Sequence, residues 1–215
     1  MVAMWILKSV GMVIGSFIIG IVFYYITSPL QSEQKKKQLE EVLSLIINFV
    51  IFIWIGKILL NVSTFISDPL AVLAYPSNAA AVYLATFFFF INIGYKIWKH
   101  PFNVEEWLGA FVPVFLASTF SYEFIQLIES GSKQGLNQLI LLMILLICYL
   151  LFQRKLSIQR MALILITGWA LGQFILSITF PMVTLFGYTM RPWFNFALTI
   201  IFTGFSYYKL RKQVL

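Results

Sequence analysis

The chain has 215 residues, of which 60% are hydrophobic and 11% charged, with a formal net charge of +7. A typical water-soluble domain carries about 25% charged residues, so a soluble globular domain of this size is excluded. The basic excess would suit a nucleic acid, but the cations lie in short segments beside apolar runs. We therefore expect a membrane protein with no nucleic-acid partner.

Seven apolar runs indicate seven transmembrane helices, because about 20 apolar residues span a bilayer as a helix. The runs are residues 5–26, 42–60, 79–97, 107–128, 136–152, 161–178 and 192–208. We expect an all-α fold, with residues 1–215 forming a single seven-helix transmembrane domain. The first run exceeds the roughly 7–15 apolar residues of a signal-peptide core and precedes its basic cluster, so we expect it to be retained.

The lysines and arginines predict the orientation of these helices. Eleven of the 15 lie at alternate ends of the runs: Lys35, Lys36, Lys37, Lys96, Lys99, Arg154, Lys155, Arg160, Lys209, Arg211 and Lys212. Only Lys8, Lys57, Lys133 and Arg191 fall on the other side. Because cytoplasmic loops carry the excess of Lys and Arg, we expect an external amino terminus and a cytoplasmic carboxyl terminus.

Lys57 and Glu123 stand out among the polar groups at membrane depth, where burying a charge is costly and usually has a reason. Counted from the predicted cytoplasmic ends, Lys57 and Glu123 both reach the outer quarter of the bilayer. They form either a charged site open to the outer leaflet or a structural ion pair at the interface. Catalytic motifs of the GxSxG, HExxH and Walker types are absent, and the lone Cys148 cannot build a thiolate metal site. We expect no metal and no cofactor.

Five segments, in this order along the chain, resemble a known family. They are residues 55–59 (IGKIL), 73–79 (LAYPSNA), 102–107 (FNVEEW, continuing through Val112-Pro113), 168–174 (GWALGQF) and 186–190 (FGYTM). Together they are similar to the prolipoprotein diacylglyceryl transferases, which are bacterial seven-helix enzymes with an external amino terminus. The resemblance implies a multi-pass protein of the bacterial plasma membrane, phosphatidylglycerol as its lipid, and a lipoprotein or another membrane protein as partner.

The chain departs from that family at the motif residues. By this alignment Tyr75 replaces the histidine implicated in thiol activation, Glu123 falls on a phosphate-holding arginine, Gln126 lies near the signature asparagine, and Gln173 replaces a late arginine. An ionised glutamate repels phosphate, and a glutamine lacks the bidentate charge of arginine. Tyrosine, with a pKa near 10, is a poor base at neutral pH. These replacements argue against the family reaction.

We therefore expect a degenerate site that binds a lipid or lipid-linked segment at the outer leaflet. Its expected residues are Lys57, Tyr75, Ser77, Asn78, Tyr122, Glu123, Gln126, Gln173 and Arg191. One alternative is an active membrane transferase for phospholipid, lipoprotein or lipid-linked sugar, with Lys57, Tyr75 and Glu123 as catalytic candidates. A second alternative is a small transporter or channel, although the inner halves of the second and fourth runs offer few polar residues for a pathway.

Overall fold

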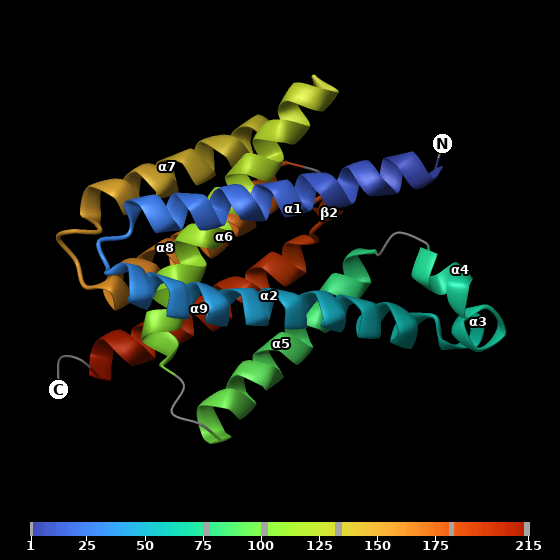
Figure 1. Ribbon diagram of the computed structural model, residues 1–215, viewed down its shortest axis with the longest axis horizontal. Helices are drawn as coiled ribbons and strands as arrows, with labels where there is room; N and C mark the ends of the chain where they lie inside the picture. The colour runs from blue at the N-terminus through green and yellow to red at the C-terminus, as the bar shows by residue number, and fades with distance from the viewer. Residues whose placement is uncertain (1, 75–77, 100–102, 132–134, 181–182, 213–215) are drawn as a thin grey trace. The chain divides into compact units, whose positions relative to one another are not determined.

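The computed structural model describes residues 2–74, 78–99, 103–131, 135–180 and 183–212, and most of them are helical (Figure 1). Seven long helices occur within these ranges, and each contains one of the predicted apolar runs. They are α1 (Val2–Thr27), α2 (Ser32–Leu60), α5 (Ala79–Lys99), α6 (Val104–Ser130), α7 (Leu136–Phe152), α8 (Ile158–Thr179) and α9 (Pro192–Lys212). The helical character predicted from hydropathy is therefore confirmed.

Five of these helices, α1, α2, α5, α6 and α8, are long and apolar enough to cross a membrane. Helix α7 is apolar but has only 17 residues, and α9 falls outside this set. These five helices are consistent with a polytopic membrane protein. The number of seven spans and the orientation of the helices remain predictions. Large apolar side chains face outward, for example Leu7 at 74% exposure and Ile26 at 74%, as lipid-facing positions would.

The stretch between α2 and α5 contains two short helices, α3 (Val62–Ser67) and α4 (Pro69–Ala74), joined at Asp68. Proline suits the first position of α4 because it has no N–H to leave unpaired. The Asp68 carboxylate accepts a hydrogen bond of 3.0 Å from the backbone N–H of Ala71. Asn78 does the same for α5, accepting at 3.0 Å from the backbone N–H of Ala81. Short polar side chains therefore set where α4 and α5 begin.

A small β-hairpin lies between α8 and α9, and the hydropathy pattern did not predict it, as it did not predict α3 and α4. Strands β1 (Thr184–Leu185) and β2 (Tyr188–Thr189) are antiparallel, with Leu185 opposite Tyr188. The two turn residues, Phe186 and Gly187, have φ angles of 48° and 83°. Two left-handed residues in succession are typical of a type I′ turn, which matches the twist of a two-residue hairpin.

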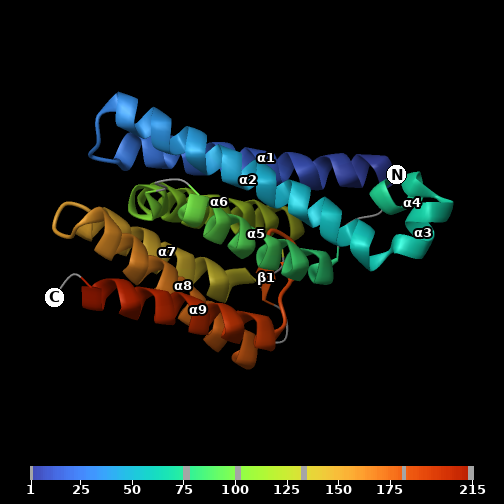
Figure 2. The ribbon, with the colours of Figure 1, turned by 90° about the horizontal axis from the view of Figure 1, so that it is seen from below.

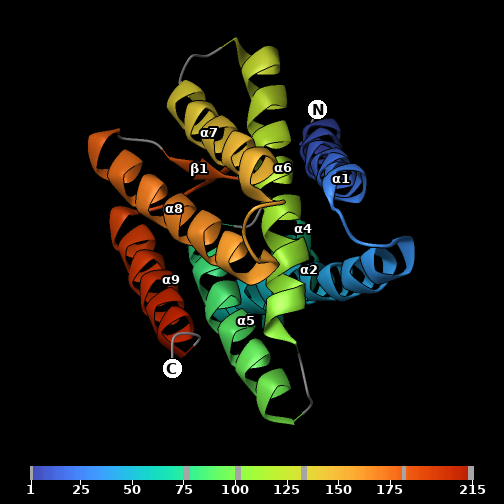
Figure 3. The same cartoon turned by 90° about the vertical axis from the view of Figure 1, so that its left-hand side faces the viewer.

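The chain divides into two compact units, which we describe separately. Unit 1 comprises Met1–Leu39 and Glu105–Leu215, and in it α7, α8 and α9 pack against one another in chain order (Figures 2 and 3). Helices α1 and α6 approach closely at Gly20, where an added Cβ would lie 2.5 Å from the Val114 carbonyl oxygen. The Tyr24 hydroxyl donates to the side-chain oxygen of Gln38 at 2.5 Å, which ties α1 to the first turns of α2.

Unit 2, Glu40–Val104, contains the rest of α2 together with α3, α4 and α5. A Cβ at Gly56 on α2 would lie 2.9 Å from the carbonyl oxygen of Ala81 on α5, so these two helices are nearly in backbone contact there. Pairs of aromatic rings continue the contact, Phe49 against Phe89 and Phe52 against Phe88. Their centroids lie 5.6 and 6.1 Å apart, within the favourable range for ring pairs.

Candidate functional site

Glu123 on α6 is the centre of a buried polar cluster in unit 1. Its side chain is only 4% exposed, and its Oε1 accepts a hydrogen bond of 3.0 Å from the Thr184 hydroxyl. The Thr184 carbonyl in turn accepts from the Nε2 of Gln138, a buried residue of α7. A chain of hydrogen bonds therefore connects α6, the hairpin and α7 through one carboxylate.

The second carboxylate oxygen of Glu123 faces the start of α7. A Cβ placed on Gly135, the residue before that helix, would lie 3.3 Å from Oε2. This is close to the limit for a carbon and oxygen in contact, so glycine leaves just enough room for the carboxylate. Gly135 therefore lies beside the Glu123 carboxylate at the start of α7.

Tyr122 and Gln126 form a neighbouring pair, one helical turn apart on α6. Tyr122 is buried, and its hydroxyl accepts a hydrogen bond of 3.0 Å from Gln126 Nε2. Gly187 in the hairpin turn passes so close that an added Cβ would lie 2.6 Å from the Tyr122 hydroxyl. The hairpin is therefore seated directly on Tyr122.

Phe186, at the tip of the hairpin, anchors it among the helices. Its ring stacks on Phe17 of α1 at a centroid distance of 5.0 Å and meets Tyr122 edge-on at 5.5 Å. It also meets Phe115 of α6 edge-on at 6.4 Å. These three aromatic contacts offset the cost, on the order of 1–3 kcal/mol, of holding a non-glycine residue in the left-handed region.

Gln173 and Trp169 present buried hydrogen-bond donors on one face of α8, since they lie four residues apart. Their side chains are 3% and 4% exposed. Neither Gln173 Nε2 nor Trp169 Nε1 has a hydrogen-bond partner among the residues that the structure describes. Buried donors of this kind require an acceptor, either ordered water or a ligand oxygen.

Of the other predicted residues, Arg191 belongs to unit 1, whereas two belong to unit 2 and two are not described. Arg191 is exposed and precedes α9, whose first turn bonds to its carbonyl oxygen. Lys57 and Asn78 belong to unit 2, where Lys57 is 8% exposed and Asn78 begins α5. Tyr75 and Ser77 lie outside the described residues. Unit 1 thus brings together Tyr122, Glu123 and Gln126, while the pairing of Lys57 with Glu123 stays a prediction.

The charge partners of Glu123 can be examined only among the described residues of unit 1. No described residue of unit 1 forms an ion pair with Glu123. Lys8, one of the four cations predicted for the outer side, pairs instead with Glu129 further along α6. No group of three metal-ligating side chains occurs in the described part of the chain. Glu123 can accept hydrogen bonds from hydroxyl or ammonium donors, but it disfavours a bound phosphate.

Sequence reasoning missed Thr184 and Gln138, which complete the cluster. Gln138 offered a signal, because it is a polar residue near the start of a strongly apolar helix. Thr184 offered none, because only the hairpin brings it to Glu123 from 61 positions away.

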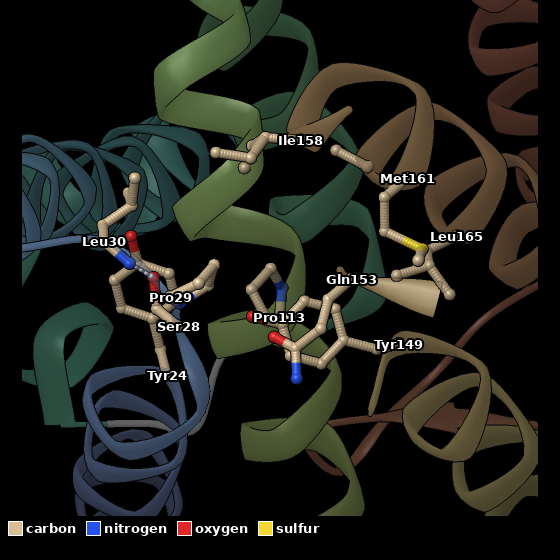
Figure 4. Close-up of a pocket in the computed structure, with 12 residues that line it drawn as sticks. Tyr24, Ser28, Pro29, Leu30, Pro113, Tyr149, Gln153, Ile158, Met161 and Leu165 are labelled. Carbon is tan, nitrogen blue, oxygen red and sulfur yellow. Dashed lines mark hydrogen bonds between the residues drawn. The ribbon is translucent and has the colours of Figure 1, made fainter. Parts of the chain in front are cut away.

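Unit 1 also contains a small pocket at the carboxyl-terminal end of α1 (Figure 4). It lies between that end, α6, α7 and α8, and its volume of about 20 Å³ admits a single water molecule. Gln153 Oε1 lines it without a hydrogen-bond partner among the described residues. Pro113 and Gly109 also line the pocket. Because proline has no N–H, the carbonyl oxygen of Gly109 lacks the helical hydrogen bond that it would otherwise accept from residue 113. A water here would satisfy these oxygens, but a larger ligand would not fit.

Comparison with known proteins found no match, either among protein-family models, among curated proteins or among solved structures. The resemblance to the diacylglyceryl transferases therefore rests on the five sequence segments alone.

Proposed function

We propose that this is a bacterial plasma-membrane protein with the helix arrangement of the diacylglyceryl transferases, whose degenerate site binds a lipid or lipid-linked segment at the outer leaflet. The observation that carries the proposal is the environment of Glu123. A buried carboxylate held by the Thr184 hydroxyl stands where the resemblance places a phosphate-holding arginine. Binding without diacylglyceryl transfer is the function that this chemistry favours.

The groups of the site differ in which part of a lipid they can contact. A diacylglyceryl transfer needs cations to hold the phosphate of the donor lipid, and Glu123 would repel that phosphate. A hydroxyl of a glycerol or sugar headgroup, by contrast, could donate to Glu123. The unpartnered donors of Gln173 and Trp169 suit the ester or headgroup oxygens of the same ligand. Phosphatidylglycerol, with both hydroxyls and esters, is the first lipid to test.

Lipid bound to the purified full-length protein tests this proposal. We expect a glycerol- or sugar-bearing lipid to co-purify in mild detergent and to be identified by mass spectrometry. The Gln173→Leu variant should fold normally and retain several-fold less of that lipid. Gln34→Leu, an exposed change on α2, serves as the matched control and should retain it fully. Absence of bound lipid, or equal loss in both variants, would contradict the proposal.

A transferase assay separates binding from catalysis. Incubation with labelled phosphatidylglycerol and a peptide bearing a lipoprotein cysteine motif should give no labelled peptide. Appearance of label would overturn the degenerate-site proposal.

An active transferase of another kind is the second candidate, favoured by the burial of Glu123 beside a hydroxyl. In that case Glu123→Gln would abolish activity on a phospholipid, lipoprotein or lipid-linked sugar without loss of folding. Exchanging the charges at Lys57 and Glu123 distinguishes a catalytic role from a structural ion pair. If each single exchange lowers stability and the double exchange restores it, a structural pair is favoured.

A further inference from the structure

A groove lies on unit 2 between α2 and α5. It encloses about 410 Å³, within the range of about 300–1,000 Å³ that is typical of ligand pockets. Its walls are almost entirely apolar, and the residues that line it are Phe52, Ile55, Phe88, Ile91, Asn92 and Tyr95. A groove of this size and lining on a membrane helix pair suits a hydrocarbon chain.

Asn92 is the one amide in this apolar wall. Its Oδ1 is buried and has no hydrogen-bond partner among the residues that the structure describes. Because a buried polar atom without a partner is destabilising, we expect the occupant of the groove to supply a polar group to Asn92. Rotation of the side-chain amide by a half turn would present either the oxygen acceptor or the NH₂ donor to that occupant.

The position of Asn92 along α5 limits what the partner can be. The helix ends at Lys99, so Asn92 lies about 10 Å before that end at 1.5 Å per residue, and about 6 Å before Lys96. If the lysines lie at headgroup level, Asn92 lies at the level of the glycerol esters of a phospholipid. Phe88, another 6 Å or so further in, then lies at the level of the acyl chains.

Positive charge adjoins the mouth of the groove. Lys96 and Lys99 follow Asn92 and Tyr95 by four residues each, so they project from the same face one turn closer to the helix end. Lys99 is held there, since its ammonium donates to the Tyr95 hydroxyl at 2.9 Å and lies 5.4 Å from the centre of that ring. An anionic headgroup complements this pair of cations, whereas a zwitterionic headgroup does so less well.

We propose that the groove binds one anionic phospholipid from the leaflet at the basic end of α5. The phosphate lies against Lys96 and Lys99, and one acyl chain runs along Phe88, Phe52 and Ile55. The side-chain amide of Asn92 turns by a half turn, so that its NH₂ group donates to an ester carbonyl. By the distribution of cations this leaflet is the cytoplasmic one, opposite to that of the proposed outer site. The groove shares no residue with that site, so each proposal can fail alone.

Native mass spectrometry of the full-length protein tests the groove, with dioleoyl phosphatidylglycerol and dioleoyl phosphatidylcholine as probes. We expect the unmodified protein to retain the anionic lipid in preference to the zwitterionic one. Each lysine near a headgroup is worth about fivefold in affinity, so Lys96→Gln with Lys99→Gln should abolish most of this preference. The matched control is Lys209→Gln with Arg211→Gln at the basic end of α9, which should leave it unchanged.

Two further variants distinguish the contribution of the groove to lipid retention from that of the charges near the headgroup. Ile91→Trp fills the groove and should reduce retention of both lipids, whereas Ile147→Trp, at an outward-facing position of similar exposure on α7, should not. Asn92→Leu should weaken retention of both lipids several-fold with the preference intact. Equal retention of the two lipids by the unmodified protein, or equal losses in groove and control variants, would overturn the proposal. In a Gln173→Leu background, Lys96→Gln with Lys99→Gln should abolish the same preference, because the groove does not include Gln173.

Discussion

The hydroxyl of Thr184 donates to Oε1 of Glu123 at 3.0 Å, and this bond joins a two-residue strand to the last third of a long helix. Thr184→Val keeps the shape of the side chain but removes the donor, leaving the buried carboxylate oxygen without this partner. We expect a loss of stability of about 1–3 kcal/mol. Thr184→Ser retains the hydroxyl and should lose less, and thermal unfolding in detergent compares the two. Equal losses would show that the bond contributes nothing.

Two buried glutamines should respond in opposite ways to the same substitution. Gln138 donates to the Thr184 carbonyl, so Gln138→Leu leaves that carbonyl unpaired and should cost about 1–3 kcal/mol. Gln173 Nε2 has no partner among the described residues, so Gln173→Leu removes a buried unpaired donor and should be neutral or stabilising. Melting temperatures of the two variants, measured in the same detergent, test this difference. The reverse order would be incompatible with the described hydrogen bonds.

The hairpin turn should tolerate no side chain at Gly187. Its φ of 83° disfavours any L residue, and an added Cβ would lie 2.6 Å from the Tyr122 hydroxyl. Gly187→Ala should therefore lose at least about 1–3 kcal/mol of stability. Removing the hydroxyl with Tyr122→Phe should restore part of this loss, because the backbone strain remains. Gly204→Ala, where nothing lies within 4 Å, is the control and should be neutral or stabilising.

Two glycines of α1, Gly20 and Gly15, should differ in how well they tolerate substitution by alanine. A Cβ at Gly20 would lie 2.5 Å from the backbone carbonyl oxygen of Val114, which cannot move away without shifting α6. Gly20→Ala should therefore destabilise unit 1 by about 1–3 kcal/mol, and Ser118→Ala should not rescue it. Gly15→Ala meets nothing within 4 Å and should be harmless. Chemical denaturation in detergent measures both, and equal effects would contradict this helix contact.

The predicted orientation can be tested by cysteine labelling in intact bacterial cells. In a Cys148→Ser background, Ser63→Cys on α3 should react with a membrane-impermeant maleimide. Lys36→Cys on α2 should react only after the membrane is permeabilised. Both positions are exposed in the structure, so access depends on the side of the membrane. The opposite labelling pattern would reverse the orientation inferred from the cations.

Much of the fold follows from hydropathy, because a helix in a bilayer satisfies its own backbone hydrogen bonds and needs only an apolar surface. The predicted run 79–97 falls within α5, and the run 136–152 has the same bounds as α7. The short helices α3 and α4 were missed because they are too brief to show a period. Glu123 could be singled out as a charge at membrane depth, but its partner could not, because Thr184 is an ordinary polar residue near a helix end.

The sequence by itself determined the helices, their apolar character and the uneven distribution of cations, since these are local properties of consecutive residues. Only the tertiary structure decided that Thr184 and Gln138 surround Glu123, that Phe186 anchors a hairpin among α1 and α6, and that Asn92 faces an apolar groove. These relations join residues far apart in the chain, and they depend on how closely particular side chains allow the helices to approach. Small residues such as Gly20 and Gly56 permit that approach, and a hydropathy pattern does not predict it.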